Sequence, residues 1–122
     1  ARIVAANRST VELGQFVTLG IGTVINGGAD VTVGADSLTA PHVVINASDH
    51  GLAAGSPMRE QPYVHESIAI GADVWIGAGA CIARGASIGA GAVVSAGSVV
   101  SGSIPPAAIV QGQPARVVKM RN

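Results

Sequence analysis

The sequence predicts an all-β fold, a parallel β-helix of hexapeptide repeats with about five coils and one extruded loop at about residues 47–63. The first observation behind this prediction is the spacing of aliphatic residues in the second half of the chain. Ile or Val returns there at every sixth position, as Ile70, Ile76, Ile82, Ile88, Val94 and Val100. This period matches neither the period of about 3.6 of a helix nor that of about 2 of a plain strand.

The second observation is a parallel series of mostly small residues, two positions before each aliphatic one: Val74, Ala80, Ala86, Ala92 and Ser98. We interpret each hexad as one strand on one side of a triangular prism, so that three hexads close a coil of about eighteen residues. The aliphatic residue points into the prism, and the small one lies near a corner. Glycine follows the aliphatic residue at Gly71, Gly77 and Gly89, where it suits a bend.

The third observation is the composition. Charged residues make up 11% of the chain, against about 25% in an average domain. Aromatic residues make up only 2%. A globular core needs bulky aromatic side chains to fill its volume, whereas a thin prism can be filled by stacked Ile, Val and Leu.

The first half extends the repeat less regularly. Leu13, Leu19 and Ile25 keep the sixfold spacing, the register slips by two at Val31-Thr32, and the spacing resumes through Val33, Thr39 and Ile45. We expect the two extra residues to bulge at a corner. The first twelve residues fit the period only weakly, through Val11 and Ala5.

Two stretches break the repeat. Residues 47–63 lose the aliphatic period and carry two Gly and two Pro, so we expect an excursion from the prism with a functional role. Pro105-Pro106 is expected to end the β pairing, because proline offers no ladder donor. The remaining tail holds Arg116, Lys119 and Arg121.

Charge and composition also exclude some classes of function. The net charge is zero, which removes the electrostatic case for nucleic acid or an anionic membrane as a partner. No apolar run approaches the roughly 20 residues of a transmembrane helix. The single cysteine, Cys81, allows no internal disulfide, so a reducing cytoplasm is the expected location. We treat residues 1–122 as one domain. Because the chain opens without Met and inside the repeat, we expect a fragment or a processed chain that lacks an N-terminal segment.

Three histidines are the candidates for acid–base chemistry. His50 lies within the excursion, where an imidazole can accept a proton near neutral pH. His42 and His65 adjoin regular hexads, so we expect outward-facing side chains without a catalytic role. The gaps of eight and fifteen residues include no close pair of ligands, and we predict no metal site. Ser48, Ser56 and Cys81 lie in no nucleophile elbow.

Several ordered motifs resemble a known family. Residues 70–78, IGADVWIGA, are similar to the IGDDVWIGA signature of the bacterial hexapeptide-repeat acetyltransferases, which include the maltose, galactoside and nodulation-factor O-acetyltransferases. Residues 49–51, DHG, and 57–61, PMREQ, resemble the loop DHGF…PIREQ of many members. Residues 104–106 and 112–118 resemble the ending IPP…GNPARVI. The resemblance covers residues 13 to 119.

This resemblance implies a left-handed β-helix, a homotrimer with active sites between subunits, and acetyl-CoA as the acetyl donor. His50 takes the place of the family's catalytic base, and Asn46, Asp49 and Trp75 are expected to line the acceptor pocket. The residues expected to bind CoA are Gly77, Ala78, Ser95, Ala96, Ser101, Arg116 and Lys119. Arg116 is ranked first for the phosphates, because a guanidinium fork suits phosphate better than a point charge.

Three features depart from the family pattern. The sugar enzymes carry an acceptor-contacting asparagine that would fall near Gly20–Gly22, where this chain has none. Their phosphate-contacting lysine is replaced by Gly102, and we expect the chain to lack their helical N-terminal segment. Three hypotheses therefore stay open: an O-acetyltransferase acting on a sugar or glycan, an N-acetyltransferase acting on an amino sugar, and an inactive trimeric scaffold.

Overall fold

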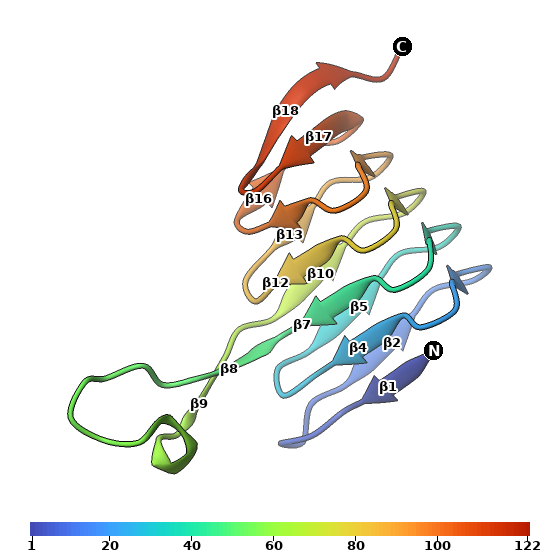
Figure 1. Cartoon of the computed structure of the whole chain (residues 1–122). Helices are drawn as coiled ribbons and strands as arrows, with labels where there is room; N and C mark the ends of the chain where they lie inside the picture. The colour runs from blue at the N-terminus through green and yellow to red at the C-terminus, as the bar shows by residue number, and fades with distance from the viewer.

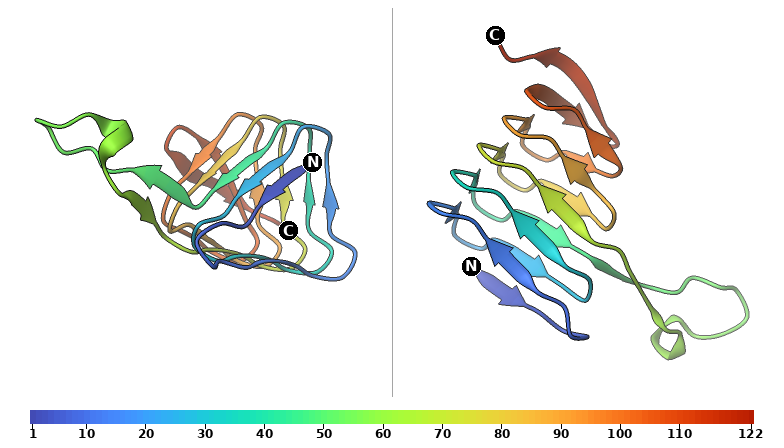
Figure 2. Two further views of the ribbon diagram at one scale, coloured as in Figure 1. Left: turned by 90° about the horizontal axis from the view of Figure 1, so that it is seen from below. Right: turned by 180° about the vertical axis from the view of Figure 1, so that it is seen from behind.

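The computed structural model describes all residues 1–122 and has the predicted fold, a left-handed parallel β-helix of about five coils (Figures 1 and 2). The chain winds around a triangular prism whose three faces are parallel β-sheets, which we call sheets A, B and C in the order in which each coil meets them. We name the prism edges after the sheets they join, as the A–B, B–C and C–A edges.

Each coil contributes one short strand to each sheet. Sheet A consists of β1 (Arg2–Val4), β4 (Val24–Asn26), β7 (Val44–Asn46), β12 (Cys81–Ala83) and β15 (Val99–Val100). Sheet B consists of β2 (Val11–Leu13), β5 (Val31–Val33), β10 (Ile68–Ile70), β13 (Ser87–Ile88) and β16 (Ser103–Ile104). Sheet C consists of β3 (Thr18–Leu19), β6 (Leu38–Thr39), β11 (Trp75–Ile76), β14 (Val93–Val94), β17 (Ala108–Gly112) and β18 (Ala115–Met120).

The core confirms the sixfold prediction. All six aliphatic residues from Ile70 to Val100 are buried, and so are their small partners from Val74 to Ser98. Because the aliphatic residues stack in register from coil to coil, the interior is a continuous apolar column. Burying a side chain of this size contributes roughly 1.5–3 kcal/mol.

The interruptions of the repeat all lie at the A–B edge. Val31 pairs with Val11 and Val33 pairs with Leu13, and both valines of β5 are buried. The two extra residues therefore lie in the corner 27–30 before β5, so the predicted site of the slip, Val31-Thr32, was wrong by a few residues. Ala5 is likewise in a corner, 5–10, and Ile3 is the residue in register with Ile25.

The excursion leaves the prism at this same edge, and it is more ordered than predicted (Figure 2). Its base is an antiparallel hairpin of β8 (Ser48–His50) and β9 (Tyr63–His65), and its tip contains a short 3-10 helix, Met58–Glu60. A loop with two strands at its base holds its side chains in a defined alternation, as an irregular loop does not.

The expectation that Pro105-Pro106 ends the β pairing was wrong. The two prolines lie at the B–C edge, where no ladder donor is required, and the coil continues into β17, in which Ala108 and Val110 are buried. Val110 pairs with Val94 in the parallel ladder. The chain then folds back as β18, antiparallel to β17, and ends sheet C. No helix in the structure has the length and apolar character needed to cross a bilayer.

Candidate active site

The hairpin β8–β9 has two chemically different faces. Ser48 lies opposite His65, His50 opposite Tyr63, and Asp49 opposite Val64. Because cross-strand partners share a face and neighbours along a strand alternate, Ser48, His50, Tyr63 and His65 lie on one face. Their rings form a row: the centroid of Tyr63 is 4.5 Å from that of His50 and 5.8 Å from that of His65.

His50 presents one nitrogen to the outside. Its Nδ1 atom is covered and has no hydrogen-bond partner, whereas Nε2 is neither covered nor bonded to any group of the chain. Nε2 is therefore the ring nitrogen of His50 that is open to solvent. Neither Asp49 nor Asn46 bonds to this ring, because both side chains form their hydrogen bonds elsewhere.

The opposite face of the hairpin is tied to the prism by Arg84, in the turn after β12. Its Nε donates to Asp49 Oδ2 at 2.7 Å, and its Nη1 donates to Glu66 Oε1. The hydrogen bond that Arg84 donates to Asp49 and the negative charges of both carboxylates raise the pKa of Arg84 above its ordinary value. This ion pair fixes the hairpin relative to sheet A.

Asn46 belongs to an asparagine pair at the end of sheet A. Its Oδ1 accepts from Asn26 Nδ2 at 2.9 Å and from the backbone N–H of Ser48 at 3.2 Å. Its Nδ2 approaches Asp49 Oδ1 at 3.4 Å. Asn46 thus shapes the start of the hairpin.

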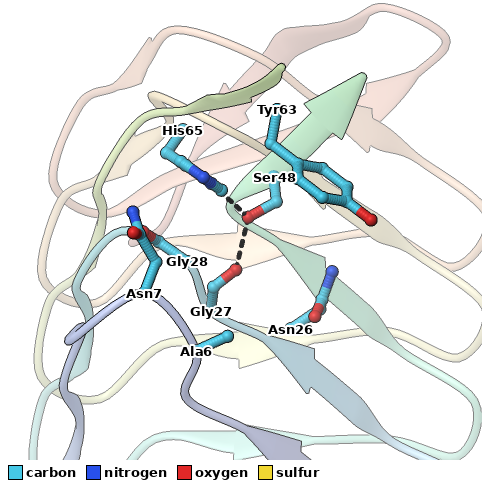
Figure 3. Close-up of a pocket in the computed structure, with 8 residues that line it drawn as sticks. All are labelled: Ala6, Asn7, Asn26, Gly27, Gly28, Ser48, Tyr63 and His65. Atoms are coloured by element: carbon cyan, nitrogen blue, oxygen red, sulfur yellow. Dashed lines mark hydrogen bonds between the residues drawn. The ribbon is translucent and has the colours of Figure 1, made fainter. Parts of the chain in front are cut away.

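A cavity of about 420 Å³ lies where the hairpin meets the A–B edge (Figure 3). It is lined by Ala6, Asn7, Asn26, Gly27, Gly28, Ser48, Tyr63 and His65. We call it the edge pocket. His65 Nδ1 lies 2.7 Å from Ser48 Oγ, and Ser48 Oγ donates to the carbonyl oxygen of Gly27 at 2.5 Å. The prediction that His65 faces outward was wrong, because β9 turns it toward Ser48. That His65 has no catalytic role stays a prediction.

Trp75 lies elsewhere, on the outer face of sheet C, and half of its surface is exposed. It lines a separate hollow of about 300 Å³ with Leu38, Asp73 and Arg121, among others. Arg121 closes one side of this hollow by donating to the carbonyl oxygen of Gly91 at 2.7 Å. Within one chain, Trp75 and His50 therefore belong to different faces of the molecule.

Four of the residues expected to bind CoA lie together at the C–A edge. Gly77 and Ala78 form one corner, and Ser95 and Ala96 form the corner of the next coil. The N–H of Gly97 donates to the carbonyl oxygen of Ala78 at 2.9 Å. A side chain at Gly77 would place its Cβ 2.5 Å from the backbone nitrogen of Ala96, so the close stacking of the two corners requires glycine there.

The turn between β17 and β18 covers the end of this C–A edge. Gln113 Nε2 donates to the carbonyl oxygen of Gly97 at 2.7 Å, and the N–H of Gly112 donates to Ser98 Oγ at 3.2 Å. Arg116 follows this turn with an exposed side chain, and Lys119 is exposed further along β18. Ser101 lies apart from this group, in the corner between β15 and β16 at the A–B edge.

Sequence reasoning assigned five side chains of the edge pocket to no site: it set Ser48 and His65 aside, and it did not single out Asn7, Asn26 or Tyr63. The signal that could have found three of them is the alternation Ser48-x-His50 and Tyr63-x-His65 on either side of the excursion. Asn7 and Asn26 carried no such signal, because their approach depends on two insertions at one edge. No group of three or more His, Cys, Asp or Glu residues is placed to hold a metal ion.

Comparisons with known proteins found one matching family and several similar acetyltransferases. Residues 67–102 match the family described as bacterial transferase hexapeptide (six repeats). A probable acetyltransferase of Mycobacterium tuberculosis is 35% identical over 119 residues, which make up 97% of this chain and 40% of that protein. The chain thus spans less than half the length of this relative.

Two solved structures share the fold at significant identity. A hexapeptide-repeat acetyltransferase of Vibrio cholerae, complexed with acetyl coenzyme A, is 32% identical with a TM-score of 0.86 over 93% of this chain and 61% of the other. A maltose O-acetyltransferase of Clostridium difficile is 28% identical, also with a TM-score of 0.86, over 100% of this chain and 67% of the other. Residues 67–102 thus carry the repeat of the bacterial hexapeptide transferases, and over nearly its whole length the chain is similar to acetyltransferases built on this repeat.

Proposed function

We propose that the chain is the catalytic β-helix of an O-acetyltransferase that moves an acetyl group from acetyl-CoA to a hydroxyl of a sugar or glycan. The observation that carries this proposal is the His50 ring, held against Tyr63 with Nε2 open to a substrate. The solved relative with acetyl coenzyme A supports the donor, and the maltose O-acetyltransferase supports a sugar hydroxyl as acceptor.

In this proposal the transfer is direct, within a ternary complex. His50 Nε2 removes the proton of the acceptor hydroxyl while that oxygen attacks the thioester carbonyl carbon. The C–O bond forms, the C–S bond breaks, and the CoA thiolate takes the proton from the imidazolium. General-base assistance of this kind is worth about 10²- to 10⁴-fold in rate.

Ser48 is a poor candidate for a covalent intermediate, which favours direct transfer. Its hydroxyl has a single proton, and the bond to the Gly27 carbonyl oxygen uses that proton, because a carbonyl can only accept. His65 Nδ1 must therefore donate to Ser48 Oγ, and it cannot act as the base that activates Ser48.

The C–A edge is the proposed path of the CoA chain. The small residues Gly77, Ala78, Ser95 and Ala96 leave room for a pantetheine arm, and Arg116 at the end of this edge would meet the 3′-phosphate. We expect Arg116→Ala to weaken CoA binding about tenfold and dephospho-CoA binding much less, as measured by calorimetry. Equal losses for the two ligands would place Arg116 away from the 3′-phosphate.

His50 and the C–A edge border opposite sides of sheet A, so one chain alone does not complete this site. The outward residues of sheet A are apolar through Val24, Val44, Cys81 and Val99, whereas those of sheet B include Glu12, Thr32, Ser87 and Ser103. A threefold assembly with sheet A toward the axis would bury the apolar row and bring the A–B edge of one copy to the C–A edge of the next.

Mixed trimers test this arrangement. His50→Ala removes the base from one chain, and Ala96→Trp fills the proposed CoA path of another while leaving its His50 intact. Each variant alone should be inactive, and refolding an equal mixture should restore about a quarter of the sites if each site joins two copies. No recovery from the mixture, or a stable monomer by light scattering at micromolar concentration, would contradict the shared site.

The activity itself is tested by thiol release from acetyl-CoA with a panel of sugars and amino sugars. Release with hydroxyl acceptors, with an acetyl ester identified by mass spectrometry, is the expected result. Release that occurs only with amino sugars and yields an amide would replace O- with N-acetylation. No release with any acceptor, from a protein that forms the trimer, would favour the inactive scaffold.

A further inference from the structure

The edge pocket contains a histidine that the proposed reaction does not use. His65 is held by one of its nitrogens and offers the other to the cavity. Since Ser48 gives its proton to Gly27, His65 Nδ1 carries the proton of the neutral ring, and Nε2 is left as a hydrogen-bond acceptor. No group of the protein bonds to this Nε2 atom.

A glycine at position 28 is required for this arrangement. Its φ of 115° lies in a region that other residues rarely adopt. A Cβ there would collide with Ser48 Oγ and would lie 2.6 Å from His65 Nδ1. The two-residue insertion at the A–B edge thus creates the space in which the Ser48–His65 pair fits.

The remaining polar side chains of the edge pocket also leave hydrogen-bond acceptors without a partner. Asn7 Nδ2 donates to the carbonyl oxygen of Gly28 at 3.2 Å, and Asn26 Nδ2 donates to Asn46 Oδ1. The two Oδ1 atoms have no partner in the protein. With His65 Nε2, three acceptor atoms without a partner in the protein therefore belong to side chains that line one cavity, and no Asp, Glu, Lys or Arg lines it.

A ligand for such a cavity must donate several hydrogen bonds and carry no charge. Hydroxyl groups of a sugar do this, whereas a carboxylate would face acceptors and an ammonium group would lose its hydration with no carboxylate to pair with. The exposed ring of Tyr63 at the rim offers an apolar surface to the C–H face of a sugar ring.

We propose that the edge pocket is a subsite for a neutral sugar, in which His65 Nε2 accepts a hydrogen bond from a hydroxyl other than the one that is acetylated. This deepens the proposed function and rests on it for the identity of the bound molecule as acceptor. His65 is then a specificity residue, separate from the base His50 on the same hairpin face.

The first test measures binding without turnover. Saturation-transfer NMR with methyl glucopyranoside should detect binding to the unmodified protein, and glucuronate and glucosamine should bind more weakly. His65→Gln, which loses the bond to Ser48, should weaken methyl glucopyranoside binding about tenfold. Gly28→Ala should weaken binding too, because it displaces the Ser48–His65 pair. Ser48→Ala, a variant with minimal risk to the fold, should also bind methyl glucopyranoside more weakly.

The matched control is Val64→Gln, which introduces the same side chain on the same strand but on the opposite face. It should leave sugar binding unchanged. Equal binding by Val64→Gln, His65→Gln and Ser48→Ala would overturn the proposal, and so would tighter binding of glucuronate than of methyl glucopyranoside. No binding of any neutral sugar to the unmodified protein would also overturn it.

The second test separates this inference from the proposed function. With the acceptor found by thiol release, His65→Gln should raise the acceptor KM about tenfold and keep kcat within a few-fold, whereas loss of the base should lower kcat. If the protein releases no thiol but binds sugar in a way that depends on His65, the subsite is supported and the proposed acetyltransferase activity is contradicted. Thiol release with an unchanged acceptor KM in His65→Gln would keep the acetyltransferase and overturn the subsite.

Discussion

The second half of the prism and the A–B edge of its first half differ in the spacing of their inward residues. From Ile70 to Val100 the inward residues keep a spacing of six and the corners are tight turns. At the A–B edge the inward residues are ten apart between Ile3 and Leu13, eight apart between Ile25 and Val33, and twenty-five apart between Ile45 and Ile70. The regular region forms the core, and the irregular edge forms the edge pocket and the hairpin.

The difference shows where a solenoid can accept new residues. One extra residue inside a strand would turn every following side chain to the other face, whereas extra residues at a corner leave the ladder intact. Lengthening a corner loop adds only about 0.6 kcal/mol of closure entropy for each doubling. Since insertions stack at one edge from coil to coil, they can build a pocket together.

The strongest test of this contrast is the loss of the proposed base on the irregular edge. We expect His50→Ala to lower kcat by about 10²- to 10⁴-fold, because a general base contributes that much to proton transfer. CoA affinity and the mass of the assembly should stay the same. Val64→Ala, on the other face of the hairpin, should retain kcat within a few-fold. An active His50→Ala protein would remove His50 from the mechanism.

The regular region should instead respond in stability. Ile82 is completely buried, so Ile82→Ala is expected to lower the free energy of unfolding by about 2–5 kcal/mol. Leu52→Ala, in the exposed tip of the hairpin, should stay within about 0.5 kcal/mol. Urea unfolding at a fixed protein concentration measures both. Similar losses for the two variants would mean that the hairpin is part of the folding core.

Arg84 joins the hairpin to the regular region of the prism. Its removal should therefore make the hairpin more mobile without unfolding the prism. We expect Arg84→Ala to speed amide hydrogen exchange in β8 and β9 several-fold and to lower kcat by less than the loss of His50, with the exchange of β12 and β15 unchanged. Arg84→Lys should give a smaller effect, because ammonium cannot bond two carboxylates as a fork. Arg59→Ala, whose contact with Glu60 is exposed at 3.9 Å, should change neither measurement.

The smallest expected effect concerns Cys81 on sheet A. Burial, and then the negative charge of Asp49, raise the pKa of its thiol. Iodoacetamide should therefore modify Cys81 more slowly in the folded protein than in urea at pH 8.5, and Asp49→Asn should speed the reaction slightly. Because the folded state holds the proton more tightly, this group makes stability fall as pH rises above the unfolded thiol pKa of about 8.5. Equal rates in folded and unfolded protein would contradict the shift.

The sequence by itself determined the prism. The positions of Ile70 to Val100 sufficed for this, because a parallel β-helix buries every aliphatic side chain of a six-residue period. The period did not fix the hand of the helix, which the family resemblance implied. The sequence also pointed to the excursion and to His50 within it, since the loss of the period and the DHG motif are local signals.

Only the tertiary structure decided the edge pocket. Asn7, Gly28, Ser48 and His65 come from three coils, and their meeting depends on insertions that happen to fall at the same edge. The tertiary structure also corrected the end of the repeat, where Pro105 and Pro106 fit a corner and β17 and β18 continue sheet C. The physical reason is the same in both cases: a period encodes which side chains are buried, whereas contacts between corners depend on how the coils stack in space.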